Sequence, residues 1–385
     1  MTLVGALGGA RLAEVDGTGT LRPERVNWEL AWWIGADDRW HFPHEEVAVR
    51  QSLLDGMPVV VTAMRVPGGD AVQRVYATPD ATIVEIANES RAPFVVAVVV
   101  SGALQLATDR ASVVVDRRVA LVGNRPASRW AVSTDGRTRQ LVASGAASDG
   151  DFVPRTDRAA RLDAAFLHPA AHGARVRFAL PLQPDAGVDR SLATGADAVA
   201  RGWRVQLARG MQVTLPDASL QQAVDTARAQ LLLAGQAWIV APEVVAALED
   251  WGFDAEAATA WKHLGVFARR KASRRSTDRA AWDDVRSRAR RGDADFLLRL
   301  RTALVSETGG TVDLLASWPH EWRGFPIDVR GAPTKLGPVS YSTAGILSVA
   351  LLWEAPPNAT MRIPAVDPAW STAEPRGETL LTPAA

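Results

Sequence analysis

The sequence contains no cysteine, and this absence excludes several kinds of chemistry together. Without thiols there is no thiol nucleophile, no disulfide scaffold, no iron–sulfur cluster and no cysteine-ligated zinc site. Long apolar runs are also absent. The longest, from Ala92 to Val100, is about half of the roughly 20 residues that a membrane helix needs. We therefore expect a buried strand there and no membrane-spanning segment.

Neither charge is in excess, because 43 Lys and Arg residues balance 43 Asp and Glu residues. This balance argues against a protein whose main task is to neutralise phosphate backbones or to bind anionic membranes. The first residues, Met1 to Arg11, contain no basic segment and too short an apolar stretch for a secretory signal. We expect a cytoplasmic protein, with neither nucleic acid nor a membrane among its partners.

Short β-branched runs are abundant between residues 26 and 145. Turn residues separate them at intervals of roughly 8–12 residues, which is typical of an antiparallel β-sandwich. We expect further strands at the triplet Gln140–Val142 and at the segments Ala174–Leu180 and Trp203–Leu207.

The apolar period changes after residue 216. With Asp217 as the expected N-cap, apolar residues recur on one face of a helix at Leu220, Val224, Ala227, Leu231 and Ala234. More helices are predicted from Pro242, over Ala255–Leu264, over Thr277–Arg290 and over Asp293–Ser306. The remainder is rich in proline and strand-like, with Ile346–Trp353 as its clearest strand.

These patterns predict an α+β fold in three parts. Residues 1–215 form an antiparallel β-sandwich domain, residues 216–308 a short region of helical hairpins, and residues 309–385 a β-rich C-terminal segment.

One segment, Trp32–Glu46, combines aromatic, acidic and basic residues. Sugar sites use this mixture, because aromatic faces stack on the ring and charged groups bind the hydroxyls. The candidates are Asp38 as a catalytic carboxylate and, for substrate binding, Trp33, Arg39, Trp40 and His41. The alternative is that the tryptophans anchor the core and Asp38 pairs locally with Arg39. We expect no metal, since Pro43 breaks the helical spacing that a zinc site on His41 and His44 needs.

Two other segments carry candidate carboxylates. Glu321 lies between Trp318 and Trp322, and apolar walls of this kind raise the pKa of a carboxyl group toward the range of a general acid. Four acidic residues fall within Glu249–Glu256, although helix capping alone explains Asp254 and Glu256. Arginines are dense over Arg269–Arg291, which we interpret as a solvated helix face rather than a nucleic-acid site.

The order of these parts resembles that of the six-hairpin glycosidases, the glucoamylase-like and debranching-enzyme-like group in which an (α/α) toroid follows a β-sandwich. The resemblance is carried by Trp203, by Val213–Leu220, and by Trp251–Ala257, where one helix ends at Gly-Phe and the next begins with Asp-Ala-Glu. It implies a carbohydrate substrate and an inverting two-carboxylate mechanism. A complete toroid needs on the order of 300 residues, so this one is shortened.

Two functions are compatible with these observations. The first is a glycoside hydrolase-like enzyme that uses Glu321 with either Asp38 or a carboxylate of the Glu249–Glu256 junction, and that binds sugar on Trp33, Arg39, Trp40, His41 and Trp322. The second is a non-catalytic sugar-binding or assembly module derived from such an enzyme. Neither requires a cofactor. A homo-oligomer is a further expectation, because a second chain is one way to complete a shortened toroid.

Overall fold

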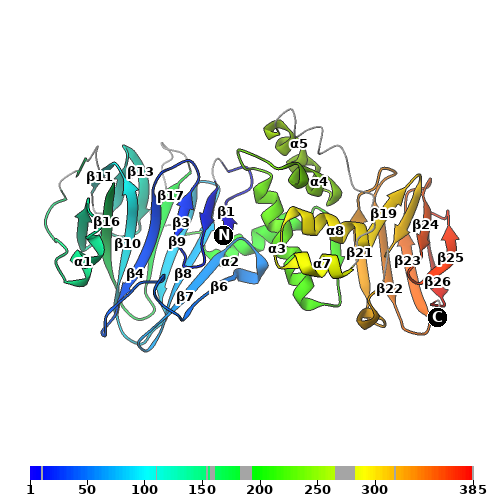
Figure 1. The fold of residues 1–385 in the computed structure, drawn as a ribbon, viewed down its shortest axis with the longest axis horizontal. Coiled ribbons are helices and arrows are strands. Elements are labelled where there is room, and N and C mark those ends of the chain that lie inside the picture. The colour runs from blue at the N-terminus through cyan, green and yellow to red at the C-terminus, as the bar shows by residue number, and fades with distance from the viewer. Residues whose placement is uncertain are drawn as a thin grey trace. The chain divides into compact units, whose positions relative to one another are not determined.

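The computed structural model describes residues 1–9, 12–109, 111–152, 155–156, 161–182, 193–264, 282–315 and 318–383. The chain divides into two compact units, Met1–Gly202 and Trp203–Ala385, whose elements are drawn in Figure 1. Helices and antiparallel sheets together confirm the predicted α+β class. Among the described helices, none combines the length and apolar character that a bilayer crossing requires. The three predicted parts remain a prediction.

The first sheet of the N-terminal unit has eight strands in the order β1-β2-β3-β4-β10-β16-β14, with β5 paired to β4. All of its pairs are antiparallel. Its strands are β1 (Thr2–Val4), β2 (Ala13–Val15), β3 (Leu21–Pro23), β4 (Glu29–Gly35), β5 (Trp40–His41), β10 (Phe94–Ala103), β14 (Arg129–Ser133) and β16 (Leu162–Ala170).

The second sheet has nine strands in the order β15-β11-β12-β13-β17-β9-β8-β7-β6. Its strands are β6 (Val49–Leu53), β7 (Val60–Val66), β8 (Gly69–Ala77), β9 (Ala81–Asn88), β11 (Gln105–Thr108), β12 (Ser112–Val115), β13 (Arg118–Gly123), β15 (Arg155–Thr156) and β17 (Arg175–Pro181). A short 3₁₀ helix, η1 (Leu54–Gly56), links β6 to β7.

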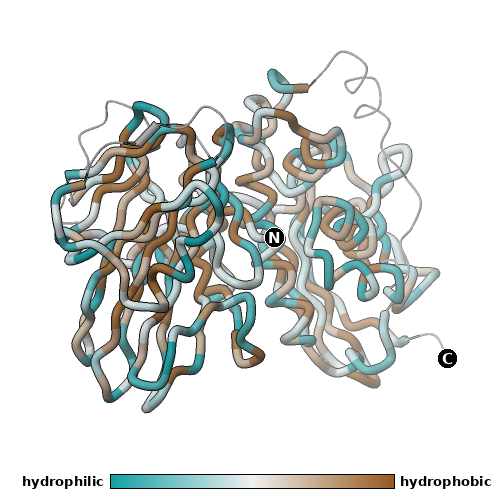
Figure 2. The backbone as a smooth tube through the Cα atoms, turned by 60° about the vertical axis from the view of Figure 1, so that its left-hand side comes forward, coloured by the Kyte–Doolittle hydropathy of each residue, from teal (hydrophilic) through white to brown (hydrophobic). Residues whose placement is uncertain are grey.

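The two sheets share one hydrophobic core, which confirms the predicted sandwich. Strand β10 supplies Val96, Val98 and Val100 to that core, whereas Ala97 and Val99 pack on the opposite face of the sheet. Burial on both faces explains why this part of the sequence is a continuous apolar run rather than an alternating one. Figure 2 shows both hydrophobic and hydrophilic stretches along the backbone of this unit.

Two predicted strands are helices in the structure. The triplet Gln140–Val142 lies in α1 (Thr138–Ala143), where Val142 packs on the outer face of the first sheet. The segment Trp203–Leu207 ends helix α2 (Ala196–Leu207). The buried residues of α2 are Ala196, Ala200, Trp203 and Leu207, which is a helical spacing. The five residues Trp203–Leu207 alone are too short a window to reveal this period.

The helices of the second unit begin and end close to the predicted positions. They are α3 (Ala218–Ala234), α4 (Pro242–Asp250), α5 (Asp254–His263), α7 (Trp282–Ala289) and α8 (Ala294–Leu304). Asp217 caps α3 as predicted, because its carboxylate accepts hydrogen bonds from the backbone N–H groups of Ser219 at 2.9 Å and Leu220 at 3.0 Å. The first residues of the helix predicted over Thr277–Arg290 lie outside the described residues.

The C-terminal part of this unit consists of two small sheets. One has the order β18-β21-β22-β23-β26, and the other β19-β20-β24-β25, with β20 and β24 parallel. The bounds are β18 (Gln212–Thr214), β19 (Val305–Thr308), β20 (Thr311–Leu314), β21 (Ile327–Ala332), β22 (Val339–Ala344), β23 (Val349–Glu354), β24 (Thr360–Ile363), β25 (Asp367–Thr372) and β26 (Arg376–Leu381). The predicted strand at Ile346–Trp353 corresponds to β23 and the turn before it.

A buried histidine makes the stability of the sandwich depend on pH. Burial and, to a lesser extent, the positive charge of Arg125 lower the pKa of His168 from 6.5 to about 4, although a hydrogen bond with the backbone of Pro126 acts in the opposite direction. Below pH 6.5 the unfolded chain therefore takes up a proton that the folded chain does not. Because of His168, we expect the unfolding free energy to decrease by about 2–3 kcal/mol when the pH falls from 7 to 4.

Urea unfolding of wild type and of His168→Leu across this pH range measures the effect. His168→Leu is expected to lose less stability on acidification than wild type does. The matched control is His44→Leu, at a histidine whose side chain is 57% exposed. Identical pH dependence in wild type and His168→Leu would contradict a buried neutral imidazole.

Candidate functional site

The first candidate segment, Trp32–Glu46, folds as the hairpin of β4 and β5 with the loop that follows. Successive residues of β4 point to opposite faces of the sheet, so Trp32 lies in the sandwich core and Trp33 on the outer face. Trp33 packs edge-on against Phe42, with ring centroids 5.2 Å apart, and only 9% of Trp33 is exposed. Most of its aromatic surface is thus used for packing.

His41 is the centre of a charged network on this hairpin. Its Nδ1 lies 3.0 Å from the Glu46 carboxylate and its Nε2 lies 3.0 Å from that of Asp38. Arg39 contacts Glu46 with two nitrogens, at 2.6 and 3.1 Å. These four side chains satisfy one another, and His41 is buried beneath them.

The pKa values of both carboxylates in this network are lowered. The hydrogen bond from His41 lowers the pKa of Asp38, and the hydrogen bonds from Arg39 lower the pKa of Glu46. Both groups are therefore ionised at neutral pH. Asp38 is able to accept a proton but not to donate one as a general acid.

The second candidate segment forms the 3₁₀ helix η2 (His320–Trp322). Trp322 is buried and packs edge-on against Trp282, with ring centroids 4.5 Å apart. The carboxylate of Glu321 is 56% exposed and pairs with Arg286. Hydrogen bonds from its own backbone amide and from Arg286 lower its pKa. The increase expected for Glu321 is therefore wrong in sign, because the tryptophan rings turn inward and the carboxylate turns toward a cation.

The sequence-predicted candidates are thus divided between the two units. Asp38, with Trp33, Arg39, Trp40 and His41, lies in the first unit, whereas Glu321 and Trp322 lie in the second. Their predicted catalytic and binding roles remain predictions. Within the described residues, no group of three or more His, Asp or Glu side chains is arranged to hold a metal ion.

The third candidate segment, Glu249–Glu256, is the turn between α4 and α5. Gly252 has a φ of 76°, a left-handed conformation that glycine adopts without strain, and it reverses the chain between the two helices. Glu249 accepts a hydrogen bond from the indole of Trp261 at 2.7 Å, which fixes its carboxylate. Glu256 pairs instead with Arg209, at 2.5 Å.

Three carboxylates of this turn line a cavity of about 420 Å³ in the second unit. Helix α8, strand β19 and the turn after β21 form its other walls. The lining residues are Glu249, Asp250, Asp254, Arg301, Thr302, Val305, Ser306, Glu307, Pro333, Thr334 and Lys335. Four carboxylates, one guanidinium, one ammonium and three hydroxyl groups therefore surround one space.

Two further residues of this cavity are held in defined positions. Arg301 is buried, and its guanidinium donates to the backbone carbonyls of Val305 and Pro333. Glu307 accepts a hydrogen bond from the backbone N–H of Lys335 at 2.9 Å. Neither residue is among the candidates predicted from the sequence. A signal for Arg301 exists, since it lies on the buried face of α8 together with Leu297 and Leu304.

No protein-family model matches the chain, and no curated protein matches it. Similar solved structures include a bacterial glucoamylase complexed with acarbose, with a TM-score of 0.47 and 5% identity over 68% of this chain and 49% of that chain. Another is a family GH92 inverting mannosidase from Bacteroides thetaiotaomicron, with a TM-score of 0.38 and 10% identity over 60% of this chain and 36% of that one. This chain thus spans about half of the first and about a third of the second. At TM-scores this low, neither likeness assigns a function.

The histidine network leads to a prediction about stability. Glu46→Ala removes the acceptor of Arg39 and leaves one ring nitrogen of buried His41 without its carboxylate. We expect a loss of about 1–3 kcal/mol in unfolding free energy, measured by urea denaturation. The matched control is Glu45→Ala, which removes the neighbouring exposed carboxylate that pairs with Arg139 and is expected to change stability little. Equal effects of the two substitutions would contradict the role given to His41.

Proposed function

We propose that this chain is a carbohydrate-binding protein whose binding site is the cavity between the α4–α5 turn, α8 and β19. The observation that carries the proposal is the convergence of Glu249, Asp254 and Glu307 on one cavity of about 420 Å³. That volume falls within the range of small-molecule sites, which is about 300–1,000 Å³.

The chemistry of the lining suits a neutral polyhydroxyl compound. Carboxylates accept hydrogen bonds from sugar hydroxyls, and the cations of Arg301 and Lys335 donate to hydroxyl oxygens. With four carboxylates against two cations, the lining is rich in hydrogen-bond acceptors and carries net negative charge, so a neutral ligand with many hydroxyl donors fits better than an anion. Trp261 and the backbone of Lys335 orient two of the carboxylates before a ligand arrives, which reduces the entropy that binding must overcome.

Hydrolysis of a glycosidic bond at the same cavity is the second candidate function. Glycosidases use two carboxyl groups, one as acid and the other as base or nucleophile. Here the carboxylates come from two elements, Glu249 and Asp254 from the helical turn and Glu307 from β19. Glu321 and Asp38 are not assigned to this reaction, because neither lines this cavity.

The binding proposal is tested by calorimetric titration with glucose, maltose, mannose and cellobiose. We expect saturable binding of at least one of these sugars. Glu249→Gln and Glu307→Gln should each weaken binding by about tenfold, because each converts a charge-assisted hydrogen bond into a neutral one. The amide oxygen of Gln still accepts from Trp261 or from the backbone of Lys335, so both variants are expected to fold.

Glu243→Gln is the matched control, since Glu243 lies in the first turn of the same helix α4 and is exposed. Its sugar affinity should equal that of wild type. Assays with 4-nitrophenyl glycosides separate the two candidate functions: turnover that Glu307→Gln abolishes supports hydrolysis, and binding without turnover supports a non-catalytic module. Absence of binding by all four sugars, or binding that neither cavity variant weakens, would refute the site.

A further inference from the structure

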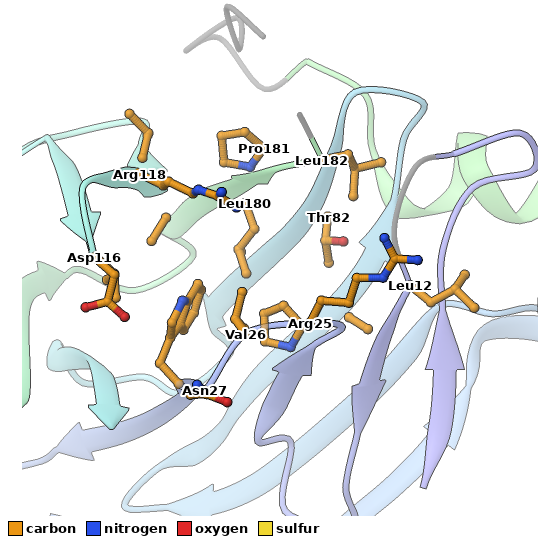
Figure 3. Close-up of a pocket in the computed structure, with 16 residues that line it drawn as sticks. Leu12, Arg25, Val26, Asn27, Thr82, Asp116, Arg118, Leu180, Pro181 and Leu182 are labelled. Carbon is orange, nitrogen blue, oxygen red and sulfur yellow. The ribbon is translucent and has the colours of Figure 1, made fainter. Parts of the chain in front are cut away.

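A second cavity, of about 280 Å³, lies in the first unit at one end of the β-sandwich. It opens between the two sheets, where the connection from β3 to β4 meets the β12–β13 hairpin and the end of β17 (Figure 3). Neither the sugar-site proposal nor any sequence motif accounts for it.

Most of the cavity wall is apolar. Buried side chains of both sheets contribute to it, namely Leu12, Ala13, Val115, Ala120, Leu180 and Leu182. Thr82 of β9 adds one hydroxyl, and Trp28, packed against the core, adds an indole. The wall therefore suits the hydrocarbon body of a small ligand.

Two arginines add positive charge to this apolar wall. Figure 3 shows Arg118 approaching from the β12–β13 side and Arg25 from the other side, with Leu180 and Thr82 between them. Arg118 is exposed and makes no ion pair or side-chain hydrogen bond with any residue in the described ranges. Its charge is available to a ligand.

The carboxylate nearest to Arg118 along the chain does not neutralise it. Asp116 instead accepts hydrogen bonds from the backbone N–H groups of Leu104 and Gln105, both at 2.9 Å. Figure 3 shows Asp116 on the β12–β13 side of the cavity, apart from Thr82 and Arg25. With two arginines and one aspartate among its lining residues, the cavity keeps a net positive charge.

Both arginines are carried by backbone with a defined local conformation. Asp116 and Arg117 form a two-residue hairpin loop in which both φ angles are positive, 49° and 66°, and Arg118 is the first residue after it. Arg25 also has a positive φ, 62°. The connection that carries Arg25 packs closely against Gly102. A Cβ atom at Gly102 would lie only 2.6 Å from the carbonyl oxygen of Asn27, so only glycine leaves room for this approach. The backbone that carries Arg118 and Arg25 is therefore in place before a ligand binds.

We propose that this cavity binds a small organic carboxylate with an apolar body, its carboxylate group held by Arg118. An apolar wall with the Arg118 cation at one side matches an anion that carries hydrocarbon, because the tail loses contact with water while the head meets a guanidinium. This site lies in the other unit from the proposed sugar site and does not depend on it.

Calorimetric titration with octanoate and 4-phenylbutyrate tests the proposal, and the two probes distinguish a straight-chain body from an aryl one. We expect at least one to bind with a stoichiometry of one. The neutral analogue of the bound probe, octanamide or 4-phenylbutyramide, should bind at least tenfold more weakly. Arg118→Gln should weaken binding by about tenfold, because a charge-assisted contact is lost.

Arg117→Asn is the matched control, since it removes an equal charge from the adjacent exposed residue of the same loop, and asparagine tolerates its positive φ. This variant should bind like wild type. Ala120→Leu, which adds bulk to the wall, should abolish binding, and a melting curve shows whether each variant is folded. Failure of both carboxylates to bind, equal binding of acid and amide, or equal loss in Arg117→Asn and Arg118→Gln would each overturn the proposal.

Discussion

The second unit depends on a junction at which helix α8 becomes strand β19 without a loop between them. Leu304 ends the helix and Val305 begins the strand, and both are fully buried. A helix end leaves carbonyl groups without helical partners, and buried carbonyls need other donors. Here the hydroxyl of Tyr341 donates to the carbonyl of Leu304 at 2.9 Å, and the guanidinium of Arg301 donates to that of Val305.

This junction also determines where the polar cavity lies. Because the chain continues directly from α8 into β19, the last turn of the helix and the first strand residues lie on one continuous wall. Arg301 thereby has two tasks, since it satisfies buried backbone carbonyls and also places a positive charge among carboxylates. The turn between α4 and α5 supplies the facing carboxylates. The proposed sugar site thus arises where helical and strand elements of one unit meet.

Much of the fold was predictable because local rules act over short distances. Asp217 at an N-cap, Pro242 at a first helical position and the apolar run within β10 each specify their own element. Helix α2 was missed because its buried positions repeat only when Ala196–Leu207 is taken as a whole. Strand β19 was missed because the apolar residues of α8 and of the strand follow one another without a turn signal.

The candidate sites were less predictable, because side-chain pairing is a three-dimensional property. The position of Glu321 between two tryptophans indicates apolar walls, yet the indole of Trp322 is buried and Arg286, 35 positions earlier in the chain, reaches the carboxylate. The carboxylates near Glu249 were identified from their density. Their partner Glu307 lies on a strand in another part of the sequence, and no spacing rule connects it to them.

Hydrogen exchange followed by mass spectrometry, with and without saturating sugar, tests the central claim most directly. If sugar binds in the cavity, backbone amides in residues 249–254, 301–307 and 333–335 should exchange more slowly in its presence, because a bound ligand suppresses local opening. Protection confined to residues 32–46 or 318–325, where aromatic residues and carboxylates alternate in the sequence, would contradict the account. That result would instead indicate that sugar binds at the hairpin around His41 or at the segment around Glu321.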